Sequence, residues 1–91
     1  MTQHTLPHDE SNPDPRAGHY YVSAVDGPRY WLLAGPFASH SEALAMVDTA
    51  TSLAHEHDAA GRLSFAGFGT CRREDHGGFG RLNALLGLAT A

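Results

Sequence analysis

Apolar and polar residues follow two different periods along the chain. Residues 19–25 and 30–34 are rich in aromatic and β-branched side chains, which is typical of strands. Between them, residues 26–29 read Asp-Gly-Pro-Arg, and Asp-Gly readily adopts the positive φ that a tight turn needs. The pattern therefore predicts an antiparallel hairpin.

A helical period begins after the second strand. Pro36 has no N–H for a sheet ladder and suits the point where the strand stops. Ser39 and Glu42 have the Ser-x-x-Glu spacing of a capping box. From there to His57 or Asp58, apolar residues recur every three or four positions, which predicts one amphipathic helix. The rest of the chain is organised around this strand-to-helix joint.

Two weaker elements follow the helix. Residues 62–71 read as a third strand in which Gly67 or Gly69 marks a bulge, and residues 79–88 read as a short C-terminal helix broken by Gly87. A right-handed strand-helix-strand connection makes the third strand parallel to the second and places it beside the first. We therefore expect an α+β fold: a β-β-α-β unit with sheet order 2-1-3, one long helix on one face and a short C-terminal helix.

The beginning of the chain differs in composition from the rest. The first seventeen residues contain three prolines and, besides Met1, a single large aliphatic side chain. Such a segment buries too little apolar area to offset the entropy lost on ordering. We expect a disordered arm over residues 1–17 and a single compact domain over residues 18–91.

Both faces of the predicted sheet are apolar. Side chains alternate across a strand, so Tyr20 and Val22 lie on one face, and Tyr21 and Val25 lie on the other. One helix covers one face only. The second face is then covered by residues 79–88 folding back, by a second copy of the chain in a homodimer, or by a partner.

Charge and cysteine content narrow the function classes. The chain has 91 residues, ten acidic side chains, six Arg, no Lys and a formal net charge of −4. Nonspecific affinity for nucleic acid comes from Lys and Arg, so this composition suits a basic protein surface better. A single Cys excludes an internal disulfide and is compatible with a reducing cytosol. With no run of membrane-span length and no secretion-signal pattern, we expect a cytoplasmic protein and no membrane partner.

The candidates for chemistry are few. His55 and His57 are two residues apart on a helix and point in different directions, with His57 on the apolar stripe, whereas histidines that share a metal lie four apart. Cys71, with His76 five residues later, lacks the oriented base that an activated thiol needs. We therefore expect no metal, no cofactor and no catalysis. An enzyme built around Cys71 stays as a third hypothesis.

The candidate partner-binding residues are acids on the polar side of the predicted helix and aromatic residues of the hairpin. The acids would provide charge complementarity and the aromatic rings would serve as anchors, although such charged faces often serve only solvation. The full set is Glu42, Asp48, Glu56, Asp58, Tyr21, Tyr30 and Trp31. The alternative is a nucleic-acid-binding accessory module that uses the basic residues Arg29, Arg62, Arg72 and Arg73.

Two resemblances bear on these hypotheses. Residues 35–43, Gly-Pro-Phe-Ala-Ser-His-Ser-Glu-Ala, resemble the Gly-x-Phe-x-Thr-x-x-Glu-Ala joint of AP2-like and integrase arm-binding DNA modules. Those modules are basic and place three strands before the helix, whereas this chain is acidic and has two there. Residues 20–70, with Phe68-Gly69-Thr70 in the last strand, resemble small proteins of proteobacterial phages, plasmids and integrative elements.

Small acidic proteins of that origin include anti-CRISPR inhibitors, some of which act as DNA mimics. The resemblance therefore implies a non-enzymatic inhibitor from a phage or mobile element. It would dock through an acidic surface on the nucleic-acid-binding groove of a CRISPR effector complex.

Overall fold

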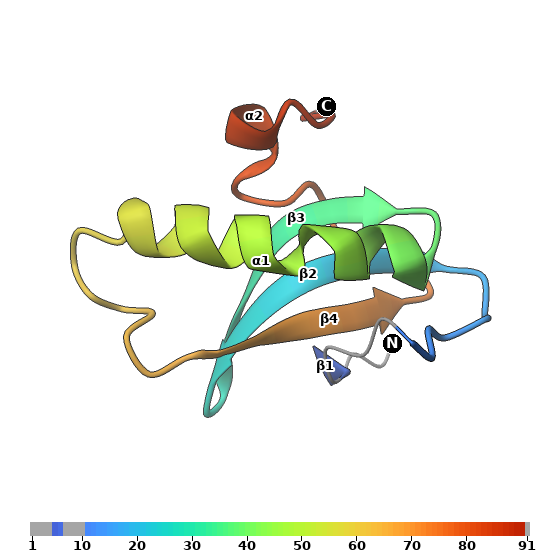
Figure 1. The fold of residues 1–91 in the computed structure, drawn as a ribbon, viewed down its shortest axis with the longest axis horizontal. Helices are drawn as coiled ribbons and strands as arrows, with labels where there is room; N and C mark the ends of the chain where they lie inside the picture. Colours follow the sequence, from blue (N-terminus) through green and yellow to red (C-terminus); the bar gives the residue numbers. More distant parts are fainter. Residues whose placement is uncertain (1–4, 7–10, 91) are drawn as a thin grey trace.

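The structure, a computed structural model, describes residues 5–6 and 11–90. Four strands form one antiparallel sheet in the order β1-β4-β2-β3, and α1 lies across one face of it (Figure 1). In chain order the elements are β1 (Thr5–Leu6), β2 (His19–Asp26), β3 (Arg29–Phe37), α1 (His40–Glu56), β4 (Gly67–Arg73) and α2 (Asn83–Leu86).

The three long strands confirm the predicted α+β fold with sheet order 2-1-3, because β2 pairs with β3 on one side and with β4 on the other. A short strand at the far edge was not expected. In β1, Thr5 pairs with Cys71 and Leu6 pairs with Thr70. The disordered arm predicted over residues 1–17 therefore includes two residues that join the sheet. Residues 1–4 and 7–10 lie outside the described part of the chain.

Two strand boundaries differ from the prediction. The third long strand, β4, begins at Gly67 instead of residue 62, and residues 58–66 form turns in which Phe65 is 92 % exposed. β3 continues through a cis Gly35–Pro36 bond to Phe37, so Pro36 does not end it. An outer strand tolerates a residue without an N–H. The register irregularity lies between β2 and β3, while the pairing of β2 with β4 is continuous.

The predicted helix cap is present. Ser39 Oγ accepts a hydrogen bond from the Glu42 N–H at 3.2 Å. The Ser39 hydroxyl donates to Glu42 Oε1 at 3.0 Å. The Glu42 side chain thus bonds the Ser39 side chain, whereas in a full capping box it would accept from the Ser39 backbone N–H. The buried side of α1 includes Val47 and Ala50, which pack with Val22 of β2 in the main core.

The C-terminal segment runs along the outer edge of β3. The backbone N–H groups of residues 80, 81 and 82 donate to carbonyl oxygens of β3, in the pairs Gly80–Gly35, Arg81–Leu32 and Leu82–Leu33. An added Cβ at residue 80 would collide with the backbone of Ala34, so this close approach requires glycine. The helix predicted over residues 79–88 is limited to α2, which ends at Leu86. Its C-cap Gly87 has a φ of 73°, so the predicted break at this glycine is confirmed.

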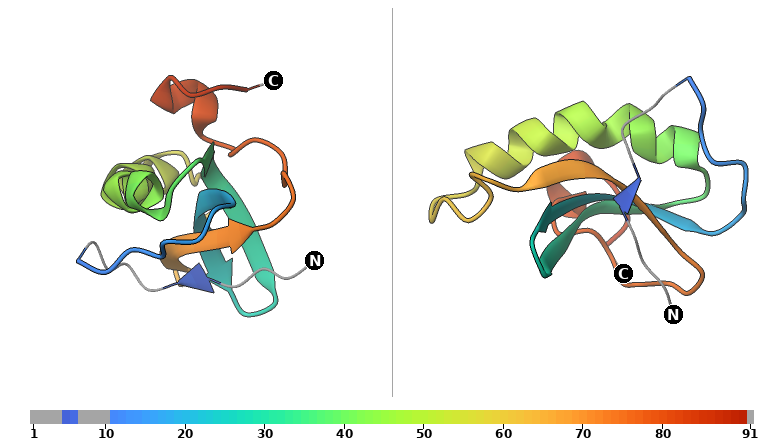
Figure 2. Two further views of the ribbon diagram at one scale, coloured as in Figure 1. Left: turned by 90° about the vertical axis from the view of Figure 1, so that its right-hand side faces the viewer. Right: turned by 90° about the horizontal axis from the view of Figure 1, so that it is seen from below.

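Asn83 fixes this segment to the strand. Its side chain is 1 % exposed, and its Oδ1 accepts the Gly35 N–H at 3.1 Å while its Nδ2 donates to the Gly35 carbonyl at 2.6 Å. Leu82 is part of the core, and Leu86 and Leu88 pack against it. The C-terminal segment thus closes the edge of β3, with α2 beyond that edge rather than flat on the second sheet face (Figure 2).

The second sheet face, which bears Tyr21, is buried at one end and open at the other. Tyr21 and Cys71 are both 0 % exposed, and the Tyr21 hydroxyl donates to the Gly78 carbonyl and accepts the Gly77 N–H. At the other end of this face, Tyr30 is 52 % exposed. Burial of the open end in a homodimer stays a prediction.

A polar contact seals the sheet against the beginning of α1. His40, the first residue of α1, is 4 % exposed, and its ring stacks on Tyr20 with centroids 5.3 Å apart. Its Nδ1 accepts the Asp14 N–H at 2.6 Å, and its Nε2 lies 2.8 Å from Thr70 Oγ1. The tautomer with its proton on Nε2 satisfies both contacts. The side chain of Arg16 bonds Asp14 in turn and holds the pKa of that carboxyl well below its usual range.

Candidate functional site

The outer side of α1 carries three of the four predicted acids. Glu42, Asp48 and Glu56 are exposed. Glu42 and Glu56 are fourteen positions apart, which is about 21 Å along the helix at 1.5 Å per residue. Figure 1 shows α1 lying in front of the sheet, with the side that faces away from the strands uncovered by any other element. The helix therefore presents separated carboxylates to solvent.

The fourth acid, Asp58, has a different role. Its Oδ1 accepts the Arg62 N–H at 2.9 Å and its Oδ2 accepts the Leu63 N–H at 2.7 Å. Both carboxylate oxygens thus hold the turn that follows α1. These hydrogen bonds give Asp58 a role in the fold, and its contact with a partner stays a prediction.

The three aromatic candidates do not meet on one surface. Tyr21 is fully buried, so the prediction that it anchors a partner is wrong. Tyr30 pairs with Val25, and Trp31 pairs with Ala24, so their side chains lie on opposite faces of the sheet. Trp31 is half-buried on the α1 side. Of the three aromatic candidates, only Trp31 lies on the α1 side of the sheet.

The arginines of the alternative hypothesis are also dispersed. Arg72 donates through Nε and Nη2 to the Ala17 carbonyl, and Arg29 pairs with Asp26 at 3.1 Å. Arg72 and Arg73 are neighbours in β4 and therefore point to opposite faces of the sheet. These residues do not form the continuous basic stripe that tracks a nucleic-acid backbone.

The candidates for chemistry do not assemble either. Burial raises the pKa of the Cys71 thiol to about 11, which keeps it protonated at neutral pH. His76 is exposed and its Nδ1 accepts the Gly78 N–H. In the described residues, no three His, Cys, Asp or Glu side chains come together as they would around a metal ion.

The two helix histidines are placed differently from the prediction. His57, expected on the buried stripe, is exposed because α1 ends at Glu56 and His57 is its C-cap. His55, expected on the wet side, is exposed but its ring lies 5.1 Å from that of Phe68. Neither belongs to a metal site in the described part of the chain.

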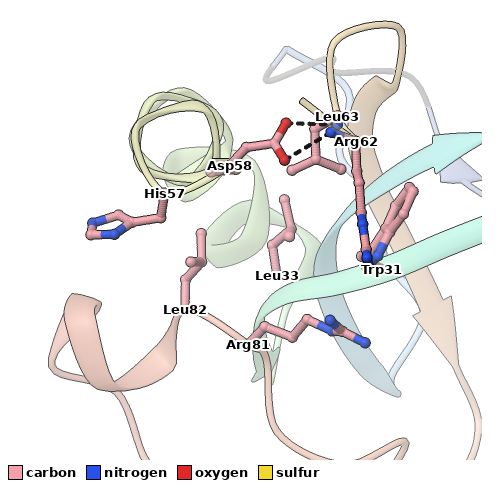
Figure 3. Close-up of a pocket in the computed structure, with 9 residues that line it drawn as sticks. Trp31, Leu33, His57, Asp58, Arg62, Leu63, Arg81 and Leu82 are labelled. Atoms are coloured by element: carbon pink, nitrogen blue, oxygen red, sulfur yellow. Dashed lines mark hydrogen bonds between the residues drawn. The ribbon is translucent and has the colours of Figure 1, made fainter. Parts of the chain in front are cut away.

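A hollow that sequence reasoning missed lies beside Trp31 (Figure 3). It lies at the C-terminal end of α1, and its lining includes Trp31, Arg62 and Arg81. The sequence groups Arg62 and Arg81 only loosely with Arg72. Their convergence follows from the docking of the C-terminal segment on β3, which no local pattern signals.

Comparison with known proteins adds no relative. The chain matches no protein-family model, no curated protein and no solved structure. Neither helix in the described part of the chain is long and apolar enough to cross a membrane.

Proposed function

We propose that this chain is a non-enzymatic protein-binding inhibitor that docks through the outer face of α1 on a basic partner surface. The observation that carries the proposal is the exposure of Glu42, Asp48 and Glu56 along one helix of a Lys-free protein with net charge −4. Complementary charge steers association and selects partners. Burial of the sole Cys in the sequence supports binding over catalysis.

Charge density decides what kind of docking this face supports. Duplex DNA carries one charge per about 1.7 Å of axis, so about 21 Å of duplex holds about twelve. Three carboxylates over the same length complement a few cationic side chains and do not copy a whole phosphate backbone. The partner implied by the sequence resemblance is the nucleic-acid-binding groove of a CRISPR effector complex, and such a partner places the chain in the cytoplasm.

A pair of charge reversals tests the proposal. Asp48→Lys with Glu56→Lys should weaken binding to a purified effector complex about 100-fold, or about 2.7 kcal/mol. The matched control is Glu74→Lys with Asp75→Lys, which changes the net charge equally on an exposed loop. The measurement is competition between the chain and fluorescent target DNA for the complex.

The outcomes separate three cases. A large loss for the helix pair and a small loss for the loop pair support docking through α1. Equal losses show that only net charge matters, and unchanged binding removes the helix face from the interaction. If the unaltered chain does not compete with DNA on any complex tested, this class of partner is excluded.

A further inference from the structure

The hollow beside Trp31 has an apolar floor and a cationic rim. Its volume is about 230 Å³. The floor includes Leu33, Leu63 and Leu82, which are 3 %, 8 % and 8 % exposed. In Figure 3, the side chains of Arg62 and Arg81 both extend toward Trp31, whereas the ring of His57, which also lines the hollow, points away from Trp31.

The guanidinium groups at this rim are available to a ligand. Within residues 5–6 and 11–90, neither Arg62 nor Arg81 has a side-chain hydrogen bond or an ion pair, and only their backbone N–H groups are bonded. A third arginine, Arg29, places its Cζ 5.5 Å from the centroid of the Trp31 ring. Three of the six arginines in this acidic protein thus lie close to its only indole.

The balance of arginines and carboxylates near the hollow indicates which ligand charge the site favours. Asp26 forms an ion pair with Arg29, and both carboxylate oxygens of Asp58 accept hydrogen bonds from backbone N–H groups. At the end of α1, the His57 N–H donates to the Leu53 carbonyl and the Asp58 N–H donates to the His55 carbonyl, so two carbonyls of the last turn are bonded within the protein. Three guanidinium groups exceed two carboxylates by one charge, which favours a ligand with a single negative charge.

Volume and shape narrow the ligand further. A cavity of about 150 Å³ holds benzene, so the hollow has room for one ring and one small acidic group. Guanidinium groups bind carboxylates through paired hydrogen bonds, and an indole packs against a flat ring. An apolar floor next to two unpaired cations suits a molecule with one flat apolar side and one anionic end.

We propose that this hollow binds a small aromatic carboxylate, with its ring against Trp31 and the leucine floor and its carboxylate on Arg62 and Arg81. The site is distinct from the outer face of α1 and does not depend on the function proposed for that face. It gives the chain a small-molecule ligand in addition to a protein partner.

The only tryptophan of the chain makes the site directly observable. Benzoate should change Trp31 fluorescence saturably and shift the indole Nε1–H resonance. Benzamide, which has nearly the same shape without the charge, should bind at least tenfold more weakly. Equal affinity for the two probes would overturn recognition of the carboxylate, and no saturable response to benzoate would overturn the site.

Substitutions locate the anion. Arg62→Gln and Arg81→Gln should each weaken benzoate binding about tenfold and leave benzamide binding unchanged. Arg16→Gln is the matched control, because it removes the same charge from an arginine that pairs with Asp14 away from the hollow. An equal loss in the control, or no loss in either rim variant, contradicts the proposal. If a rim variant fails to fold, the ratio of benzoate to benzamide affinity in the unaltered chain decides.

Discussion

The polar groups at the two ends of α1 differ in burial and in hydrogen bonding. At the first residue, His40 is buried, stacks on Tyr20 and has both ring nitrogens in contact with polar partners. At the other end, His57 is exposed beside a hollow whose two arginines have no side-chain partner among the described residues. One end is sealed by the protein itself, and the other leaves cationic groups for a ligand.

This difference distinguishes structural polar groups from functional ones. A buried polar group must find its hydrogen bonds inside the protein, and when it does so it stabilises one arrangement of the chain. Exposed arginines beside an apolar hollow have no such role in the fold. We therefore interpret the His40 end as architecture, and the ligand site that we propose lies at the His57 end.

The largest expected effect tests the sealed end. His40→Ala should lower the free energy of unfolding by about 3 kcal/mol, because it leaves a cavity and removes the partners of Asp14 N–H and Thr70 Oγ1. His57→Ala, at the exposed end, should change it by less than about 0.5 kcal/mol. Urea unfolding followed by circular dichroism measures both. Similar losses for the two variants would remove the contrast between the ends.

The next effect uses pH at the same sealed end. Cys71 follows Thr70, the partner of His40, and burial raises the pKa of its thiol to about 11 from an ordinary value near 9. Above pH 9 the unfolded chain loses this proton while the folded chain keeps it. The contribution of Cys71 to stability should therefore be full below pH 9 and fall by about 2 kcal/mol between pH 8 and pH 10.5.

A variant isolates this contribution from other groups. The pKa values of Tyr20 and Tyr21 are also raised by burial, so both lower stability at high pH whether or not the thiol is present. Urea unfolding of Cys71→Ala at both pH values should show a smaller loss than the unaltered chain, by about 2 kcal/mol. The same loss in both proteins would show that the thiol is as accessible as it is in the unfolded chain.

Sequence reasoning predicted the elements that depend on local signals. Ser39 and Glu42 fix the start of α1, and residues 26–29 close the hairpin, because each signal acts over a few neighbouring residues. It did not predict the docking of the C-terminal segment. The Asn83 side chain bonds the backbone of Gly35, which is 48 positions away in the sequence. The residues next to Asn83 contain no pattern that indicates this distant partner.

The candidate sites divide in the same way. The exposure of Glu42 and Glu56 follows from helical period and was predicted. The hollow was not, because Trp31, Arg62 and Arg81 come from three separate segments and meet only through the tertiary fold. Helical periodicity predicts which face of the helix a side chain lies on but not its hydrogen-bond partners. The bonds from Asp58 to the turn after α1 therefore could not be predicted.

The smallest expected effect concerns the C-terminal end of α1 and the turn that follows it. Asp58→Ala should lower the free energy of unfolding by about 1 kcal/mol, because the backbone N–H groups of Arg62 and Leu63 lose a charged acceptor near solvent. Glu56→Ala removes the same charge two residues away at an exposed position and should have almost no effect. Hydrogen exchange separates the two cases: the amides of Arg62 and Leu63 should exchange faster in Asp58→Ala only. If both variants leave these amides unchanged, the turn is held by its apolar contacts, and Asp58 returns to the set of carboxylates that a partner can use.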